Sequence, residues 1–128
     1  MLVRFVTDWI DEDSCEAAGL FVAASWVRHN GDPAEVNLAR LAELREWFNQ
    51  HLDTPRRFNR SRRPHRKKKA ISWFKDSALE HIARAREMAR LISASGVSVR
   101  EIRTKRPGYI LYEDEFQLVA EPFAETGR

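Results

Sequence analysis

Residues 97–120 read VSVREIRTKRPGYILYEDEFQLVA, and this stretch decides the fold class. Runs rich in β-branched and aromatic residues at 97–103, 109–112 and 116–120 predict three consecutive strands. Pro107 and Gly108 predict a type II turn between the first two strands, because Pro fixes φ and Gly tolerates a positive φ. The acidic residues 113–115 predict a solvated hairpin tip. Consecutive strands with no helix between them favour an antiparallel sheet.

The remaining elements lie upstream of this stretch. Further strands are predicted over 2–7 and 70–74, and helices over 15–29, 32–52 and 78–94. Asp32 before Pro33 is typical of a helix start, Gly31 of the left-handed end of the preceding helix, and Ser77 with Glu80 of a capping box. The order β-α-α-β-α-β-β-β predicts a single α+β domain over residues 1–128. We expect a small mixed or antiparallel sheet of about five strands, with three helices packed on one face.

The predicted first helix is apolar on nearly every side between residues 17 and 27. A helix without a polar face is either buried in its own domain or covered by another chain. We therefore expect it to form the domain core or half of a homodimer interface. In the core version, changing Phe21 or Trp26 to Ala should cost about 3–5 kcal/mol.

Composition bounds the class of protein. The chain has 128 residues, 43% of them apolar and 10% aromatic, which is sufficient for one packed core. Cys15 is the only cysteine, so an intramolecular disulfide is excluded. No secretory signal and no membrane-spanning run is recognisable, which predicts a cytoplasmic protein without a membrane partner.

The basic loop at residues 54–69 is the most distinctive feature of the sequence. Between residues 56 and 69, nine of fourteen residues are Arg or Lys and none is acidic. The other 13 basic and 19 acidic residues give the remaining chain a net charge of −6. Such a block favours a polyanionic partner, through guanidinium and ammonium contacts to phosphate and through stacking of aromatic rings on bases. The candidate nucleic-acid-binding residues are Arg56, Arg57, Phe58, Arg60, Arg62, Arg63, His65, Arg66, Lys67, Lys68 and Lys69. Arginines at 84, 86, 90, 100, 103 and 106, with Lys105, form a supplementary basic set if they share a face with this loop.

Signals for catalysis are weak. Asp8, Asp11, Glu12 and Asp13 form an acidic cluster whose carboxylates suit Mg²⁺ in a small nuclease, but their spacing matches no calcium loop. His29, His51, His65 and His81 are not spaced as metal ligands, and nothing near Cys15 marks it as a nucleophile. The glycines are scattered, so no phosphate-binding glycine loop is present. No catalytic residue, metal or cofactor is therefore predicted.

Three functions remain open. The first is a non-enzymatic nucleic-acid-binding protein, for RNA or DNA, that contacts phosphate through the basic loop. The second is a protein–protein interaction module, an inhibitor or assembly subunit, that docks on another protein through the apolar first helix or binds an acidic partner. The third is a small metal-dependent nuclease that uses the N-terminal carboxylates.

Overall fold

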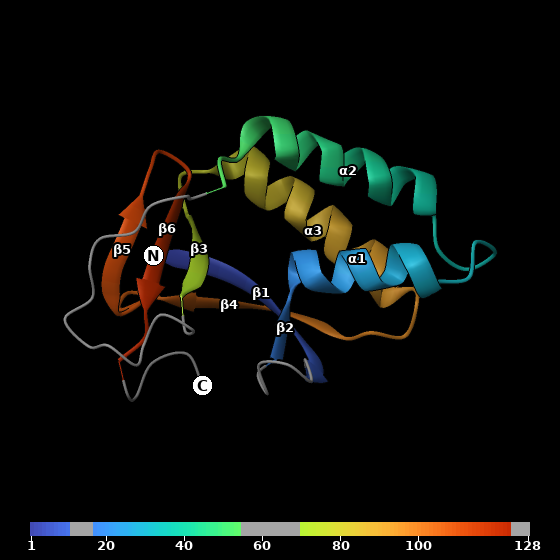
Figure 1. Cartoon of the computed structure of the whole chain (residues 1–128), viewed down its shortest axis with the longest axis horizontal. Coiled ribbons are helices and arrows are strands. Elements are labelled where there is room, and N and C mark those ends of the chain that lie inside the picture. The colour runs from blue at the N-terminus through green and yellow to red at the C-terminus, as the bar shows by residue number, and fades with distance from the viewer. Residues whose placement is uncertain (11–16, 55–69, 124–128) are drawn as a thin grey trace.

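The computed structural model describes residues 1–10, 17–54 and 70–123 (Figure 1). Its strands are β1 (Leu2–Ile10), β2 (Ala17–Gly19), β3 (Ile71–Lys75), β4 (Val99–Thr104), β5 (Tyr109–Glu113) and β6 (Gln117–Glu121). Its helices are α1 (Leu20–Asn30), α2 (Leu38–His51) and α3 (Leu79–Ser93). The predicted α+β class and order of elements are confirmed, with the short strand β2 in addition. None of these described helices has the length and apolar character needed to cross a membrane.

Strand β1 is the centre of an antiparallel sheet. On one edge, β4 pairs with it continuously from Leu2 to Thr7. On the other edge, β3 pairs only with Leu2 and Val3, whereas β2 pairs from Val6 onward. Strands β6 and β5 continue the sheet beyond β3. Strands β2 and β3 therefore separate along β1, and we call the opening between them the fork (Figure 1).

The main core lies between the sheet and the helices. Helices α1 and α3 contact β1, and α2 packs on both of these helices (Figure 1). From the sheet, Val3, Phe5 and Phe74 are buried in this core. The helices contribute Leu20, Ala23, Ala24, Val27, Leu41, Leu44, Phe48, Ile82, Ala85, Met88 and Ile92. Leucine spacing along α2 and alanine spacing along α3 thus place one stripe of each helix inward, as their periodicity predicts.

A second apolar cluster lies on the opposite face of the sheet. Neighbouring strand residues point to opposite faces, so Trp73 points away from the helices when Phe74 points toward them. Ile71, Leu118 and Ala120 are buried together with Trp73, which is 2% exposed. Both faces of β6 are therefore buried, which explains why all five of its residues are buried, the polar Gln117 and Glu121 included.

Three local predictions are wrong. Residues 17–19 form β2, so α1 begins at Leu20 and is shorter than the helix expected from residue 15. Helix α2 begins at Leu38, where Asn37 accepts a hydrogen bond from the Arg40 backbone (3.0 Å). Residues 32–36 form a separate turn, which carries Val36 into the core at 2% exposure. The N-cap of α3 is Ala78, without a side-chain cap, so the predicted capping box is not formed.

Candidate nucleic-acid interface

The predicted nucleic-acid-binding residues, 56 to 69, lie outside the described part of the chain. The structure does describe the two residues at which this segment is attached, Thr54 and Ala70. Both line one cavity, which occupies the fork and has a volume of about 510 Å³. The basic segment therefore leaves and rejoins the fold at the same cavity.

The position of Thr54 and Ala70 is fixed by strand β6. Gln117 is 3% exposed, and its side-chain amide donates to the backbone carbonyl of Asp53 (2.5 Å). The same amide donates to Asp114 (3.1 Å), whose carboxylate also accepts from the hairpin backbone. On the other side, Ile71 pairs with Ala120 of β6. One strand thus holds the end of α2 and the start of β3 beside each other.

Aromatic rings form one wall of the fork cavity. Phe21 of α1 meets Phe48 of α2 edge to face, with 5.0 Å between ring centroids. Phe48 is 6.0 Å from Phe74 of β3, which in turn is 6.4 Å from Phe5 of β1. All four residues line the cavity. Four elements that are distant in sequence therefore build a continuous aromatic surface.

The polar lining of the cavity carries more positive than negative charge. Arg4 of β1 and Arg45 of α2 are the basic residues, and Asp53 is the acidic one. Within the described ranges, no carboxylate forms an ion pair with Arg45. Asn49, one helical turn after Arg45, and Ser72 add an amide and a hydroxyl. The arrangement suits a ligand with both an aromatic and an anionic part.

Sequence reasoning missed these lining residues. The spacing of Arg45 and Asn49 places them on one face of a helix, and this signal is present in the sequence. Their approach to Ser72 depends on how α2 and β3 meet, which no local pattern encodes.

The supplementary basic set is largely occupied by partners within the fold. Arg86 and Arg103 both donate to Glu101, with closest distances of 2.8 and 2.9 Å. These two guanidinium groups lower the pKa of Glu101 to about 2, from an ordinary value of 4.5. Arg84 pairs with Glu80 (3.1 Å) and lies over the Trp47 ring at 4.4 Å. None of these residues lines the fork cavity, so the set does not extend the interface there.

Among the described residues, the other predicted candidates form no catalytic constellation. Asp8 lies 3.7 Å from Arg100, whereas Asp11, Glu12, Asp13, Cys15 and His65 lie outside the described residues. No cluster of three metal-ligating side chains occurs in the part of the chain that the structure places. His29 and His51 each donate a ring N–H to the carbonyl one turn earlier, both at 2.8 Å. His81 is buried, and its Nε2 donates to the His51 carbonyl (2.7 Å). The three described histidines thus serve the fold.

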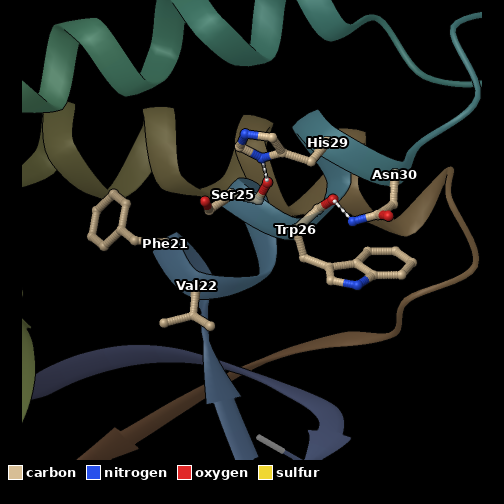
Figure 2. Close-up of a pocket in the computed structure, with 6 residues that line it drawn as sticks. All are labelled: Phe21, Val22, Ser25, Trp26, His29 and Asn30. Atoms are coloured by element: carbon tan, nitrogen blue, oxygen red, sulfur yellow. Dashed lines mark hydrogen bonds between the residues drawn. The ribbon is translucent and has the colours of Figure 1, made fainter.

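Helix α1 divides into a buried and an exposed side. Its buried side is Leu20, Ala23, Ala24 and Val27. On the other side, Phe21, Val22 and Trp26 are 37%, 50% and 42% exposed. Figure 2 shows Val22 and Trp26 projecting from α1 away from α2. In the described part of the chain only one side of α1 is therefore covered, so the core version of the prediction holds for that side alone.

No protein-family model, curated protein or solved structure matches this chain.

Proposed function

We propose that this chain is a non-enzymatic nucleic-acid-binding protein that contacts the phosphate backbone through residues 56–69. Arginine offers a fork of donors that matches two phosphate oxygens, and lysine adds a mobile point charge. Each phosphate neutralised in this way releases counterions, which drives binding to RNA or DNA regardless of sequence. A cytoplasmic location, where RNA is abundant, belongs to the same proposal.

The observation that supports this function best is the place of attachment. The basic segment is anchored at Thr54 and Ala70 on the lining of the fork cavity, where Arg45 and Arg4 also lie. The most basic stretch of the sequence is thus tethered beside the two arginines of the cavity. Elsewhere on the fold, Arg84, Arg86 and Arg103 are paired with carboxylates. The basic segment and Arg45 together make the fork side a favourable place for a polyanion.

The test is the salt dependence of duplex DNA binding in two matched variants. One variant changes Arg66, Lys67, Lys68 and Lys69 to Ala. The control changes four exposed basic residues outside the fork to Ala: Arg28, Arg90, Arg100 and Lys105. Each variant lowers the formal net charge by four, so only the place of the charge differs.

We expect the segment variant to flatten the slope of log K against log salt by roughly 3.6, if each lysine and arginine contacts one phosphate at about 0.9 per contact. The control should change the slope by less than about one contact. Circular dichroism should show both variants folded. Wild-type protein without salt-dependent binding to RNA or DNA at low ionic strength would exclude this function.

The exposed side of α1 favours a second function, a protein–protein interaction module. Phe21, Val22 and Trp26 present apolar side chains next to one another, and such patches mark interfaces. A second copy of the chain, as in a homodimer, is the partner to test first. In sedimentation over a range of concentrations, Trp26→Asp should weaken self-association. Leu79→Asp is the control, because Leu79 is 75% exposed and isolated from this patch. A wild-type protein that is monomeric at all concentrations would exclude the homodimer.

A further inference from the structure

The proposed contacts of residues 56–69 with the phosphate backbone give the cavity in the fork no role. Its volume of about 510 Å³ falls inside the range of roughly 300–1,000 Å³ typical of ligand pockets. We propose that it binds one unpaired nucleobase together with its phosphate, presented by a single strand or by a free nucleotide. The choice of ligand rests on the proposed function, whereas the site itself rests on the described residues.

The aromatic wall suits the face of a base. Phe21 is 37% exposed and contacts Phe48, which is 4% exposed and therefore fixed by the core. An accessible ring on a fixed support stacks with little loss of side-chain entropy. Every base has a π-face, so stacking on phenylalanine accepts any of the four.

The edge of strand β3 suits the edge of a base. β3 pairs with β1 only at Phe74 and Lys75. On the fork side, Ile71, Ser72 and Trp73 pair with no strand in the described part of the chain. An open strand edge offers both backbone N–H and C=O groups, and base edges carry the complementary acceptors and donors in the plane of the ring.

The positive charge of the cavity lining favours a nucleotide, which carries a phosphate, over an uncharged base or nucleoside. Arg45 lines the cavity beside Asn49 and has no carboxylate partner among the described residues. A guanidinium without a carboxylate partner binds a phosphate through two parallel hydrogen bonds. A base inside a duplex is stacked on both faces and paired along one edge, so it cannot enter without being extruded. The cavity is therefore selective for single strands.

The experiment compares three ligands of equal length by fluorescence anisotropy at low salt. They are a single strand, the same strand with abasic sites, and a duplex. The abasic strand keeps the phosphates and lacks bases, so it reports backbone contacts alone. Uridine monophosphate and uridine, titrated by calorimetry, represent the free-nucleotide source and its phosphate-free control. We expect the intact strand to bind about tenfold or more tightly than the abasic strand.

A cavity-filling variant links this difference to the fork. Gly19 lines the cavity, has an ordinary φ of −75°, and a Cβ there meets no atom within 4 Å. Gly19→Leu should therefore add a side chain to the cavity lining without a collision at Cβ. We expect it to bind intact and abasic strands equally and to leave duplex binding unchanged. Ala83→Leu, at an exposed position of α3 outside the cavity, is the control and should keep the full difference. If Gly19→Leu is unfolded by circular dichroism, Asn49→Trp at an exposed site of α2 replaces it.

The outcomes separate this inference from the proposed function. Equal wild-type binding of intact and abasic strands, with no binding of uridine monophosphate, overturns the base pocket and leaves the backbone contacts standing. The pocket is also overturned if a folded Gly19→Leu keeps the full difference. Binding of uridine monophosphate that Gly19→Leu abolishes, without binding of any strand, supports the pocket for free nucleotides and excludes the basic segment as a nucleic-acid interface. Binding of no ligand overturns both.

Discussion

Gly108 has a φ of 124°, a conformation that side chains with a Cβ rarely adopt. A Cβ at this position would also collide with the carbonyl of Glu121 on the neighbouring strand. The glycine is therefore required twice, by its backbone angle and by the close approach of β6. Sequence analysis identified the first reason, from the Pro-Gly pair, but could not identify the second.

Gly108→Ala should destabilise the fold by more than Gly96→Ala. Gly96 also has a positive φ, 94°, but a Cβ there meets no atom within 4 Å. Gly96→Ala thus measures the backbone strain alone, about 1–2 kcal/mol, and Gly108→Ala adds a steric collision. Urea unfolding of both variants gives the difference. Equal losses of unfolding free energy would show that β6 moves aside without cost.

The carboxylate of Glu101 gives a prediction about pH. Its pKa is lowered to about 2 by hydrogen bonds from Arg86 and, less strongly, Arg103. Because the folded pKa lies below the ordinary 4.5, the pairing stabilises the protein above pH 4.5, and this stabilisation is lost as pH falls toward 2. Both partners are partly exposed, so we expect less than about 1 kcal/mol. Glu101→Gln should thus unfold at lower urea than wild type at pH 7, and the gap should shrink between pH 4.5 and 2. Glu115→Gln, at an exposed position, is the control and should show no such trend.

At the scale of elements, α1 provides two valines with different surroundings. Val27 is 0% exposed and Val22 is 50% exposed on the same helix. Both Val→Ala changes gain the same helix propensity, so their difference isolates burial. Val27→Ala should cost about 1.5–3 kcal/mol, and Val22→Ala less than about 1 kcal/mol. Thermal unfolding at a concentration where the protein is monomeric measures both. A large loss for Val22→Ala under these conditions would mean that this side of α1 is covered within the monomer.

Most elements were predictable because their signals are local. Runs rich in β-branched and aromatic residues identified the three C-terminal strands, and the recurrence of Leu41, Leu44 and Phe48 identified α2. Strand β2 was not predictable, because three small residues before an apolar helix continue its pattern. Their conformation is set by pairing with β1, where Gly19 lies opposite Val6. The prediction that Gly31 is the left-handed end of α1 is also wrong, because its backbone is extended, with φ −70° and ψ 150°. A glycine is required there because a Cβ would collide with the Val27 carbonyl.

The fork cavity was beyond sequence reasoning for a related reason. The basic segment is visible in the composition, but its attachment beside Arg45 depends on β6. Gln117 reaches across 64 residues to the Asp53 carbonyl, and no pattern in either segment indicates that contact. The basic segment was thus predictable from the local sequence, whereas contacts between residues that are distant in sequence were not.

For the whole molecule, we predict a single unfolding transition. The sheet is shared by the helix-facing core and by the cluster around Trp73 on its other face, so neither is complete without the other. A single domain of this size is expected to unfold cooperatively. Two variants that keep only Trp47 or only Trp73, with the other tryptophans changed to Phe, report the two sides separately. Their fluorescence midpoints in urea should coincide with each other and with far-ultraviolet circular dichroism. Two separate urea midpoints would show that the two sides of the sheet unfold independently.

The central position of β1 has a consequence for synthesis. Leu2 and Val3 are synthesised before their partners in β3 and β4, which follow about 70 and 100 residues later. At roughly 5–20 residues per second, the wait for β4 lasts on the order of 5–20 s. During this time Val3 and Phe5 lack their partners in β4, so the nascent chain carries an incompletely paired apolar strand. The protein therefore completes its fold only after β4 has been made, and slow translation prolongs the period in which β1 is open to aggregation.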